Sequence, residues 1–164
     1  MTEAILEDGV DYINVHVRGV TELGRSLDNF SPISIKHPKY GMFNSVAGFI
    51  AWLASDGKKD IFRNLDGVPL FTYIRTNDLK GEFNNALQDH RELIEQAIEL
   101  KINQHPLLYD TFVNSTLPFK SITVYAGKTK RQQPRVDPLP DEYTFNVFLT
   151  ELRGRYKAAD FIKE

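Results

Sequence analysis

The chain has 164 residues, the usual size of one domain, and its 20 basic and 22 acidic side chains nearly balance. Near neutrality excludes a whole-protein field for nucleic acid, although a local basic patch stays compatible with it. With 41% hydrophobic and 26% charged residues, the composition is that of a folded protein and not of a disordered chain.

The chain has no cysteine, which excludes a disulfide framework, thiolate metal sites and cysteine nucleophiles together. Residues 1–10 are acidic and lack the basic start and apolar run of a signal peptide. No apolar segment approaches the ~20 residues that a membrane-spanning helix needs. We therefore expect a cytoplasmic protein with no membrane contact, folded as a single domain over residues 1–164 with residues 1–10 and 158–164 as frayed ends.

Two strand signals come first. Residues 12–18 alternate between apolar and polar side chains, as a half-buried strand does. Ile33 and Ile35 suggest a second strand, residues 37–41 read as a turn, and Phe43 would lie on the returning strand.

From residue 44 the period becomes helical. The apolar residues at this spacing are Val46, Phe49, Ile50 and Leu53. Asn44 or Ser45 is available as the N-cap, and Gly57 would close the helix. Residues 59–65 suggest a short second helix. Residues 67–76 contain a proline among mixed apolar residues, and strand and loop stay open there.

The clearest helix lies in the middle of the chain. Asp89 and Glu92 have capping-box spacing, and an apolar stripe follows, although the helix could begin as early as Glu82. The stripe consists of Ile94, Ala97, Ile98 and Ile102. Pro106 ends this helix and suits the first turn of another.

The last third predicts a strand, a loop and a helix. Residues 122–124 look like a strand, residues 127–140 are a proline-containing basic loop, and residues 145–156 have helical spacing. Because strands come early and helices mostly later, the fold class is α+β, with a small antiparallel or mixed sheet and helices packed around it.

Two features could bind nucleic acid. The basic loop carries Lys128, Lys130, Arg131 and Arg135, which could contact a phosphate backbone; the alternative is a solvated loop. Trp52 could stack on a nucleobase, but an aromatic residue at helical spacing is more often core. The four histidines lack metal-ligand spacing, so we predict no metal site, and nothing indicates a cofactor.

Several short stretches, taken in order over about residues 13–155, resemble the NADAR family, named for NAD and ADP-ribose. The matching stretches are Arg25 with Leu27-Asp28-Asn29-Phe30, Met42-Phe43-Asn44-Ser45-Val46, Ala97-Ile98-Glu99-Leu100-Lys101-Ile102-Asn103-Gln104-His105-Pro106, residues 107–116, and Glu151-Leu152-Arg153. Family members are small α+β N-glycosidases that act on ribosylated amines and, in some cases, on ADP-ribosylated guanine in DNA. The chain is similar to the divergent forms that tailed phages carry.

The chain departs from the family pattern at four positions. Ala47 stands where the family has a glutamate, Gly48 where it has a histidine, Ala54 where it has a lysine, and Asn146 where it has a glycine. An N-glycosidase must protonate the departing amine or stabilise an oxocarbenium-like centre, and alanine does neither. The sequence therefore leaves open whether the chain is an enzyme, with Lys101 as the candidate catalytic group.

The resemblance implies a protein of the host cytoplasm, if phage-encoded, that binds an N-glycosidic ADP-ribose adduct, with hydrolysis left open. The alternative is an inactive scaffold that serves as a phage–host protein interaction module. The implied partners are an ADP-ribose-like nucleotide, DNA through residues 127–140, and a protein. The implied substrate-binding residues are Arg25, Asn29, Phe30, Ser45, Ala47, Phe49, Trp52, Lys101 and Thr116.

Overall fold

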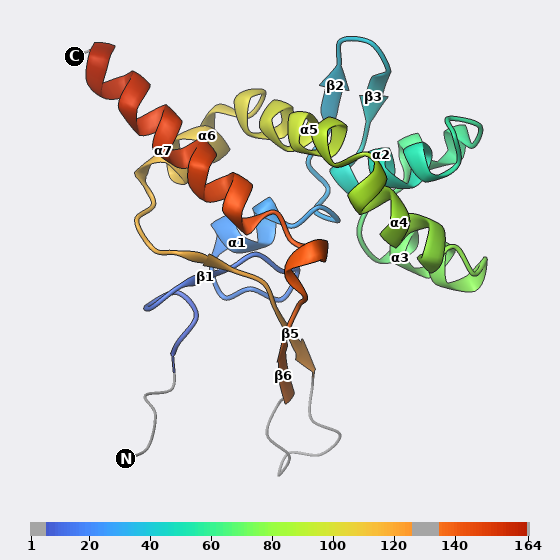
Figure 1. The fold of residues 1–164 in the computed structure, drawn as a ribbon, viewed down its shortest axis with the longest axis horizontal. Coiled ribbons are helices and arrows are strands. Elements are labelled where there is room, and N and C mark those ends of the chain that lie inside the picture. Colours follow the sequence, from blue (N-terminus) through green and yellow to red (C-terminus); the bar gives the residue numbers. More distant parts are fainter. Residues whose placement is uncertain (1–5, 126–134, 164) are drawn as a thin grey trace. The chain divides into compact units, whose positions relative to one another are not determined.

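The computed structural model describes residues 6–125 and 135–163 (Figure 1). Over these residues the chain is α+β, with helices predominating and strands paired only in twos, as β1–β4, β2–β3 and β5–β6. The predicted fold class is confirmed. The chain divides into two compact units: the central unit comprises residues 29–114, and the terminal unit joins residues 1–28 to residues 115–164.

The central unit begins with a β-hairpin. Strands β2 (Ile35–His37) and β3 (Gly41–Phe43) pair antiparallel, with Lys36 opposite Met42. Ile35 and Phe43 are fully buried, whereas Lys36 and Met42 on the other face are exposed. The predicted turn and returning strand are confirmed.

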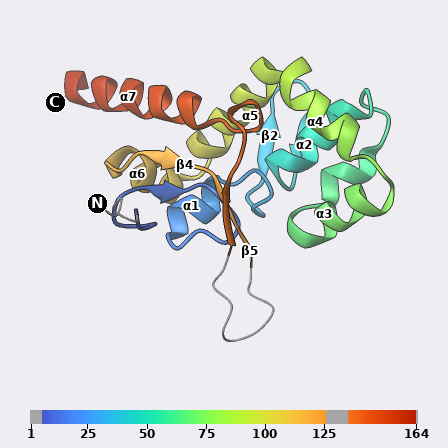
Figure 2. The same ribbon diagram turned by 60° about the horizontal axis from the view of Figure 1, so that its bottom comes forward.

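Helix α2 (Val46–Ala54) is the centre of this unit. Ser45 is its N-cap, because the hydroxyl Oγ accepts a hydrogen bond from the amide of Gly48 at 2.9 Å. Every residue from 46 to 51 is buried, and α2 packs against strand β3 and helices α4 and α5 (Figure 2). A short helix follows, as the sequence suggested for residues 59–65; it is the 3-10 helix η1 (Asp60–Asn64), and it packs on α2.

For residues 67–76 the sequence left strand and loop open, but the structure has helix α3 (Gly67–Thr76). Pro69 argued against a helix, yet a proline in the first turn loses no hydrogen bond, since the first amides of a helix have no partner there. The backbone enters the helix at Gly67 with φ of +51°, a conformation that glycine adopts without a Cβ penalty. Leu70 and Ile74, one turn apart, are the buried residues of α3.

Helices α4 (Lys80–Asp89) and α5 (Arg91–Asn103) correct the predicted capping box. Asp89 is the last residue of α4, and the N-cap of α5 is His90, with no side-chain capping hydrogen bond. Phe83, Ala86 and Leu87 give α4 an apolar stripe of its own, so the chain is already helical at Asp89. Helix α6 (Pro106–Asn114) begins at Pro106 as predicted.

The terminal unit contains the remaining strands. β1 (Ile13–Asn14) pairs parallel with β4 (Phe119–Lys120), and β5 (Ile122–Tyr125) pairs antiparallel with β6 (Arg135–Pro138). The side-chain amide of Asn14 connects β1 to β5: its Oδ1 accepts from the backbone amide of Ile122 at 2.8 Å, and its Nδ2 donates to the backbone carbonyl of Ile122 at 2.9 Å.

Two sequence predictions in this unit need correction. The strand expected over residues 12–18 is only two residues long, because the His16 amide turns back to the Asn14 carbonyl at 3.0 Å. The loop expected over residues 127–140 contains strand β6; residues 126–134 of that loop lie outside the described residues.

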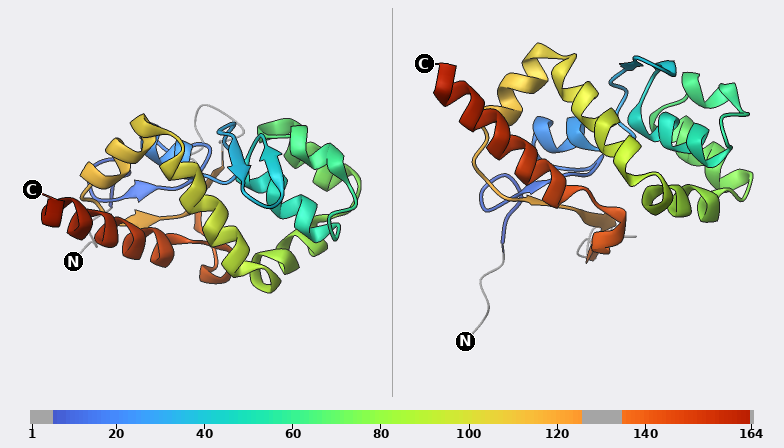
Figure 3. Two further views of the ribbon diagram at one scale, coloured as in Figure 1. Left: turned by 90° about the horizontal axis from the view of Figure 1, so that it is seen from above. Right: turned by 45° about the horizontal axis from the view of Figure 1, so that its top comes forward.

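Three helical segments complete the terminal unit: α1 (Glu22–Leu27), the 3-10 helix η2 (Asp141–Tyr143) and α7 (Asn146–Lys163). Thr21 caps α1 by accepting from the Gly24 amide at 3.0 Å. Figure 3 shows α7 as one continuous helix beside β4. The predicted final helix is confirmed, and it runs on to Lys163.

Candidate functional site

The most unusual polar residue of the central unit is Lys101. It lies on the apolar side of α5 with Ala97, Ile98 and Ile102, and only 1% of its surface is exposed. Its ammonium donates a hydrogen bond to the Ser31 hydroxyl at 2.8 Å. Because taking an ammonium out of water is costly, a buried lysine marks a candidate site for a ligand or a reaction.

The segment of residues 29–31 connects Lys101 to two other elements. The Asn29 carbonyl accepts from the Ala47 amide at 2.7 Å, in the first turn of α2, and the Phe30 carbonyl accepts from the Gly67 amide at 2.8 Å. Asn29, Ala47 and Lys101 come from three separate stretches of sequence, and this segment brings them to one place. We call Asn29, Phe30, Ser31, Ala47 and Lys101 the Lys101 site.

Asn29 is a further polar residue of the Lys101 site. Asn29 is half-buried, and its side-chain amide makes no hydrogen bond to residues 6–125 or 135–163. A primary amide both donates and accepts, so it can contact a ribose hydroxyl or a base edge. Phe30 next to it is also half-buried, with its ring 5.7 Å from Phe83 and 6.2 Å from Phe71.

Ser45 and Phe49, two further sequence candidates, are built into the core. The Ser45 hydroxyl caps α2 and also donates to the Leu65 carbonyl at 3.1 Å. Both residues have no exposed surface, so within the described residues they support the start of α2.

The two positions where the chain departs most from the family pattern are closed. Ala47 has no exposed surface. A Cβ placed on Gly48 would lie 2.4 Å from the Phe62 carbonyl oxygen and 3.1 Å from that of Leu65, so any side chain there would displace η1. The close packing of η1 on α2 therefore leaves room for glycine alone at position 48.

A cavity of about 80 Å³ is lined by Ala51 and Ala54, which follow Ala47 by one and two turns on the same face of α2, and no candidate site residue lines it. Its wall is mostly apolar, with Ser55, Lys59 and Glu82 among the lining residues. Ala54, the position of the family's late-helix lysine, lines it as well. The methyl group of Ala54 therefore contributes no charge to the wall of this cavity.

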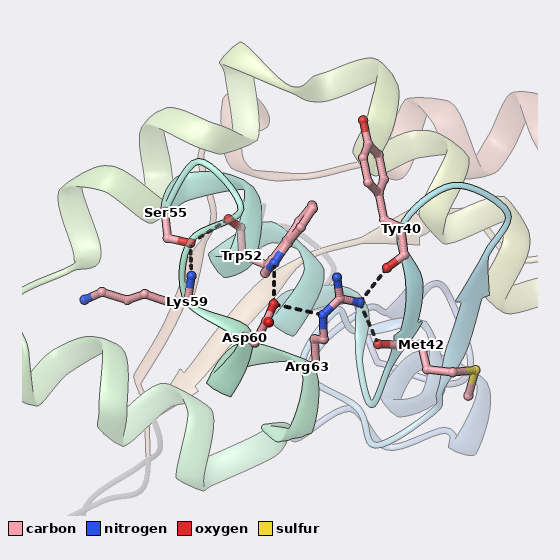
Figure 4. Close-up of polar contacts among 7 residues, drawn as sticks. All are labelled: Tyr40, Met42, Trp52, Ser55, Lys59, Asp60 and Arg63. Atoms are coloured by element: carbon pink, nitrogen blue, oxygen red, sulfur yellow. Dashed lines mark hydrogen bonds and ion pairs between the residues drawn. The ribbon is translucent and has the colours of Figure 1, made fainter.

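Trp52 belongs to a second cluster, which we call the aromatic–arginine cluster: Tyr40, Phe43, Trp52, Asp60 and Arg63. The rings of Tyr40 and Phe43 lie 5.2 Å and 5.5 Å from that of Trp52. Trp52 is half-buried, and its indole Nε1 donates to the Asp60 carboxylate at 3.3 Å (Figure 4). Hydrogen bonds from Arg63 and Trp52 lower the pKa of Asp60.

The remaining candidates belong to the terminal unit. Arg25 is exposed, and its Nη1 donates to the carbonyls of Gly19 and Val20 at 2.9 Å and 2.8 Å, while Thr116 is exposed on the segment before β4. Arg135 lies in β6. Lys128, Lys130 and Arg131 lie outside the described residues.

In the described residues, no group of three or more His, Asp or Glu side chains is placed to hold a metal ion. No helix there combines the length and the hydrophobicity needed to cross a membrane. Comparisons of the chain with protein-family models, with curated proteins and with solved structures give no match.

His37 makes the hairpin turn sensitive to pH. Its Nδ1 accepts from the amides of Lys39 and Tyr40 at 3.0 Å and 3.1 Å, and its ring stacks on Phe49 at 5.5 Å. Burial is the main cause that lowers the pKa of His37, and the positive charge of Lys39 lowers it further. A lowered pKa means that the folded state favours the neutral ring. The contribution of His37 to the free energy of unfolding is therefore complete above about pH 6.5, the pKa of histidine in the unfolded chain, and it is lost as the pH falls below that value.

We therefore predict that the free energy of unfolding falls between pH 7.5 and pH 5, with His37 contributing about 1–2 kcal/mol through the two amides that lose their acceptor. Urea unfolding at a series of pH values measures this. His37→Asn, whose side-chain oxygen can accept from the same turn, is expected to show a flatter profile. The pKa of His16 is also lowered by burial, so part of the slope remains in that variant. An identical slope in both proteins would contradict the assignment to His37.

Proposed function

We propose that this chain is a divergent NADAR-type protein whose central unit binds an N-glycosidic ADP-ribose adduct, such as ADP-ribosylated guanine in DNA. The support is twofold: the ordered resemblance over about residues 13–155, and the meeting of Asn29, Ala47 and Lys101 around the segment of residues 29–31. The observation that carries the proposal is the buried Lys101 ammonium on Ser31, since a buried cation suits a diphosphate.

The chemistry of the Lys101 site favours binding over turnover. In N-glycosidic hydrolysis, water attacks the anomeric carbon, the bond from that carbon to the base nitrogen breaks, and the departing nitrogen takes a proton. A positioned general acid contributes ~10²–10⁴ in rate, and Ala47 supplies none. Lys101 is the remaining candidate proton donor in this site. We therefore expect the protein to hold the adduct with little or no cleavage.

The test is mass spectrometry of an ADP-ribosylguanine oligonucleotide incubated with the protein and with Ala47→Glu. We expect no release of ADP-ribose by the protein itself and measurable release by Ala47→Glu. Ala47→Gln is the matched control, because it has the size of glutamate without its acid, and it should stay inactive. Thermal unfolding checks that both variants fold, since Ala47 is fully buried.

The other results have definite meanings. Release of ADP-ribose by the unchanged protein would mean that it is an active enzyme, and Lys101 would then be the next residue to replace. No release of ADP-ribose by any of the three proteins, together with no binding of the oligonucleotide, would contradict the proposed function.

A second candidate function, an inactive scaffold that docks on a protein, has an observation of its own. Helix α3 exposes Val68 by 75% and Phe71 by 54%, and these residues are one turn apart on the same face. Substitution of Val68 by serine should release a co-purifying partner under this alternative and leave nucleotide binding unchanged.

A further inference from the structure

Arg63 of the aromatic–arginine cluster is held more firmly than a surface arginine usually is. Its Nε donates to the Asp60 carboxylate at 3.1 Å, and its Nη1 donates to the carbonyls of Tyr40 and Met42 (Figure 4). The guanidinium also lies over the rings of Phe43 and Trp52, 4.5 Å and 5.0 Å from their centres. These contacts fix the plane of the guanidinium before any ligand arrives.

One end of the guanidinium is left available. Nη2 makes no hydrogen bond to the described part of the chain, and the Arg63 side chain is 28% exposed. In Figure 4 this nitrogen carries no dashed line, and the side chains of Tyr40 and Trp52 extend to the same side of it. An immobilised arginine with free N–H groups is a preorganised donor for an anion, since little side-chain entropy is lost on binding.

The charges around Arg63 favour a phosphate. Lys39 places its ammonium 5.3 Å from the centre of the Tyr40 ring, so a second cation lies on the same residue that Arg63 contacts. Asp60, whose side chain is 79% exposed, opposes them with one negative charge. The three ionised groups sum to +1, which attracts an anion and predicts that Asp60 weakens its binding.

The aromatic rings indicate what the phosphate is attached to. Tyr40 and Trp52 are both half-buried, and their rings are tilted by 54° with centres 5.2 Å apart. A ligand ring cannot enter between them at that spacing, but it can stack on their outer surface. A planar base joined to a phosphate would therefore satisfy the rings and Arg63 together.

We propose that the aromatic–arginine cluster is a second ligand site, separate from the Lys101 site, which binds a nucleoside monophosphate with its base on Tyr40 and Trp52 and its phosphate on Arg63. The two sites are separate because Ala47 and Trp52 are five residues apart on α2, which places them about 140° apart around the helix. This proposal does not depend on ADP-ribose recognition at Lys101.

Trp52 is the only tryptophan of the chain, so its fluorescence reports on this cluster alone. We expect AMP to change the fluorescence with a dissociation constant below about 1 mM, and adenosine or inorganic phosphate to bind at least about tenfold more weakly. The response should persist in Lys101→Met, which separates this site from the Lys101 site. No response to AMP at about 10 mM, or equal affinity for inorganic phosphate, would overturn the proposal.

Two variants with opposite expected effects distinguish charge recognition from structural damage. Arg63→Gln should weaken AMP binding at least about tenfold, because it removes the charge-assisted donor. Asp60→Asn keeps an acceptor for Trp52 and Arg63 but removes the negative charge, so AMP should bind about three- to fivefold more tightly. Arg75→Gln, which alters an arginine over the Phe71 ring on α3, is the matched control and should change nothing. If Arg63→Gln does not fold, Asp60→Asn decides: unchanged or weaker AMP binding in that variant would overturn the proposal.

Discussion

Replacement of Lys101 by methionine is expected to weaken ADP-ribose binding by about 10- to 100-fold while the free energy of unfolding stays within about 1 kcal/mol of that of the unchanged protein, or rises. The two effects have one cause. In the absence of ligand, burial of the ammonium costs solvation free energy, and its polar contacts, the hydrogen bond to Ser31 among them, offset that cost. A methionine of similar volume removes this cost, and it also removes the positive charge that would bind the diphosphate of the ligand.

Calorimetric titration with ADP-ribose and urea unfolding of the same samples measure both quantities. Lys80→Met is the matched control, since Lys80 is exposed at the start of α4, and it should alter neither quantity by much. A large loss of stability in Lys101→Met with ligand affinity retained would assign Lys101 to the core, and the proposed function would lose its main support.

Substitution of Gly48 by alanine is expected to destabilise the central unit by about 3 kcal/mol or more. The added Cβ would lie 2.4 Å from the Phe62 carbonyl oxygen, which belongs to backbone and cannot move without shifting η1. Gly81→Ala in α4 is the matched control, because a Cβ there meets nothing within 4 Å. An exposed helical glycine costs about 0.5–1 kcal/mol relative to alanine, so the control should be stabilised by that amount.

Chemical unfolding of the two glycine variants gives the comparison directly. Equal stabilities would mean that η1 is not packed on α2 as described. The result also decides whether position 48 can hold any side chain, such as the histidine that the NADAR pattern has there.

The sequence predicted those elements whose signals are local. The hairpin of β2 and β3 follows from alternation around a turn, and α2 follows from four apolar residues at helical spacing after a capping serine. Pro106 predicted the start of α6, because its fixed φ suits a first helical turn. Each of these signals lies within one element and needs no distant partner.

The errors arose where a contact between distant residues decided the structure. Asp89 and Glu92 have capping-box spacing, but the packing of Phe83 and Leu87 keeps the chain helical up to Asp89, the expected N-cap. Pro69 is as compatible with a loop as with a first helical turn, and the burial of Leu70 and Ile74 decides for the helix.

The Lys101 site was predictable only in part. Lys101, Asn29 and Ala47 were identified from the resemblance, whereas Ser31, 70 residues from Lys101, carried no signal of its own. Arg63 was missed as well, because a single arginine in a short helix predicts nothing until the fold places Tyr40, Phe43 and Trp52 around it.

The most direct test of the proposed function is calorimetric titration of the protein with two oligonucleotides of one sequence, with and without ADP-ribose on a single guanine. We predict binding of the modified strand at least about 100-fold tighter than that of the unmodified strand, because only the former offers a diphosphate to Lys101 and hydroxyl groups to Asn29. Equal affinity for the two strands, or no binding of either, would contradict recognition of ADP-ribose by this chain.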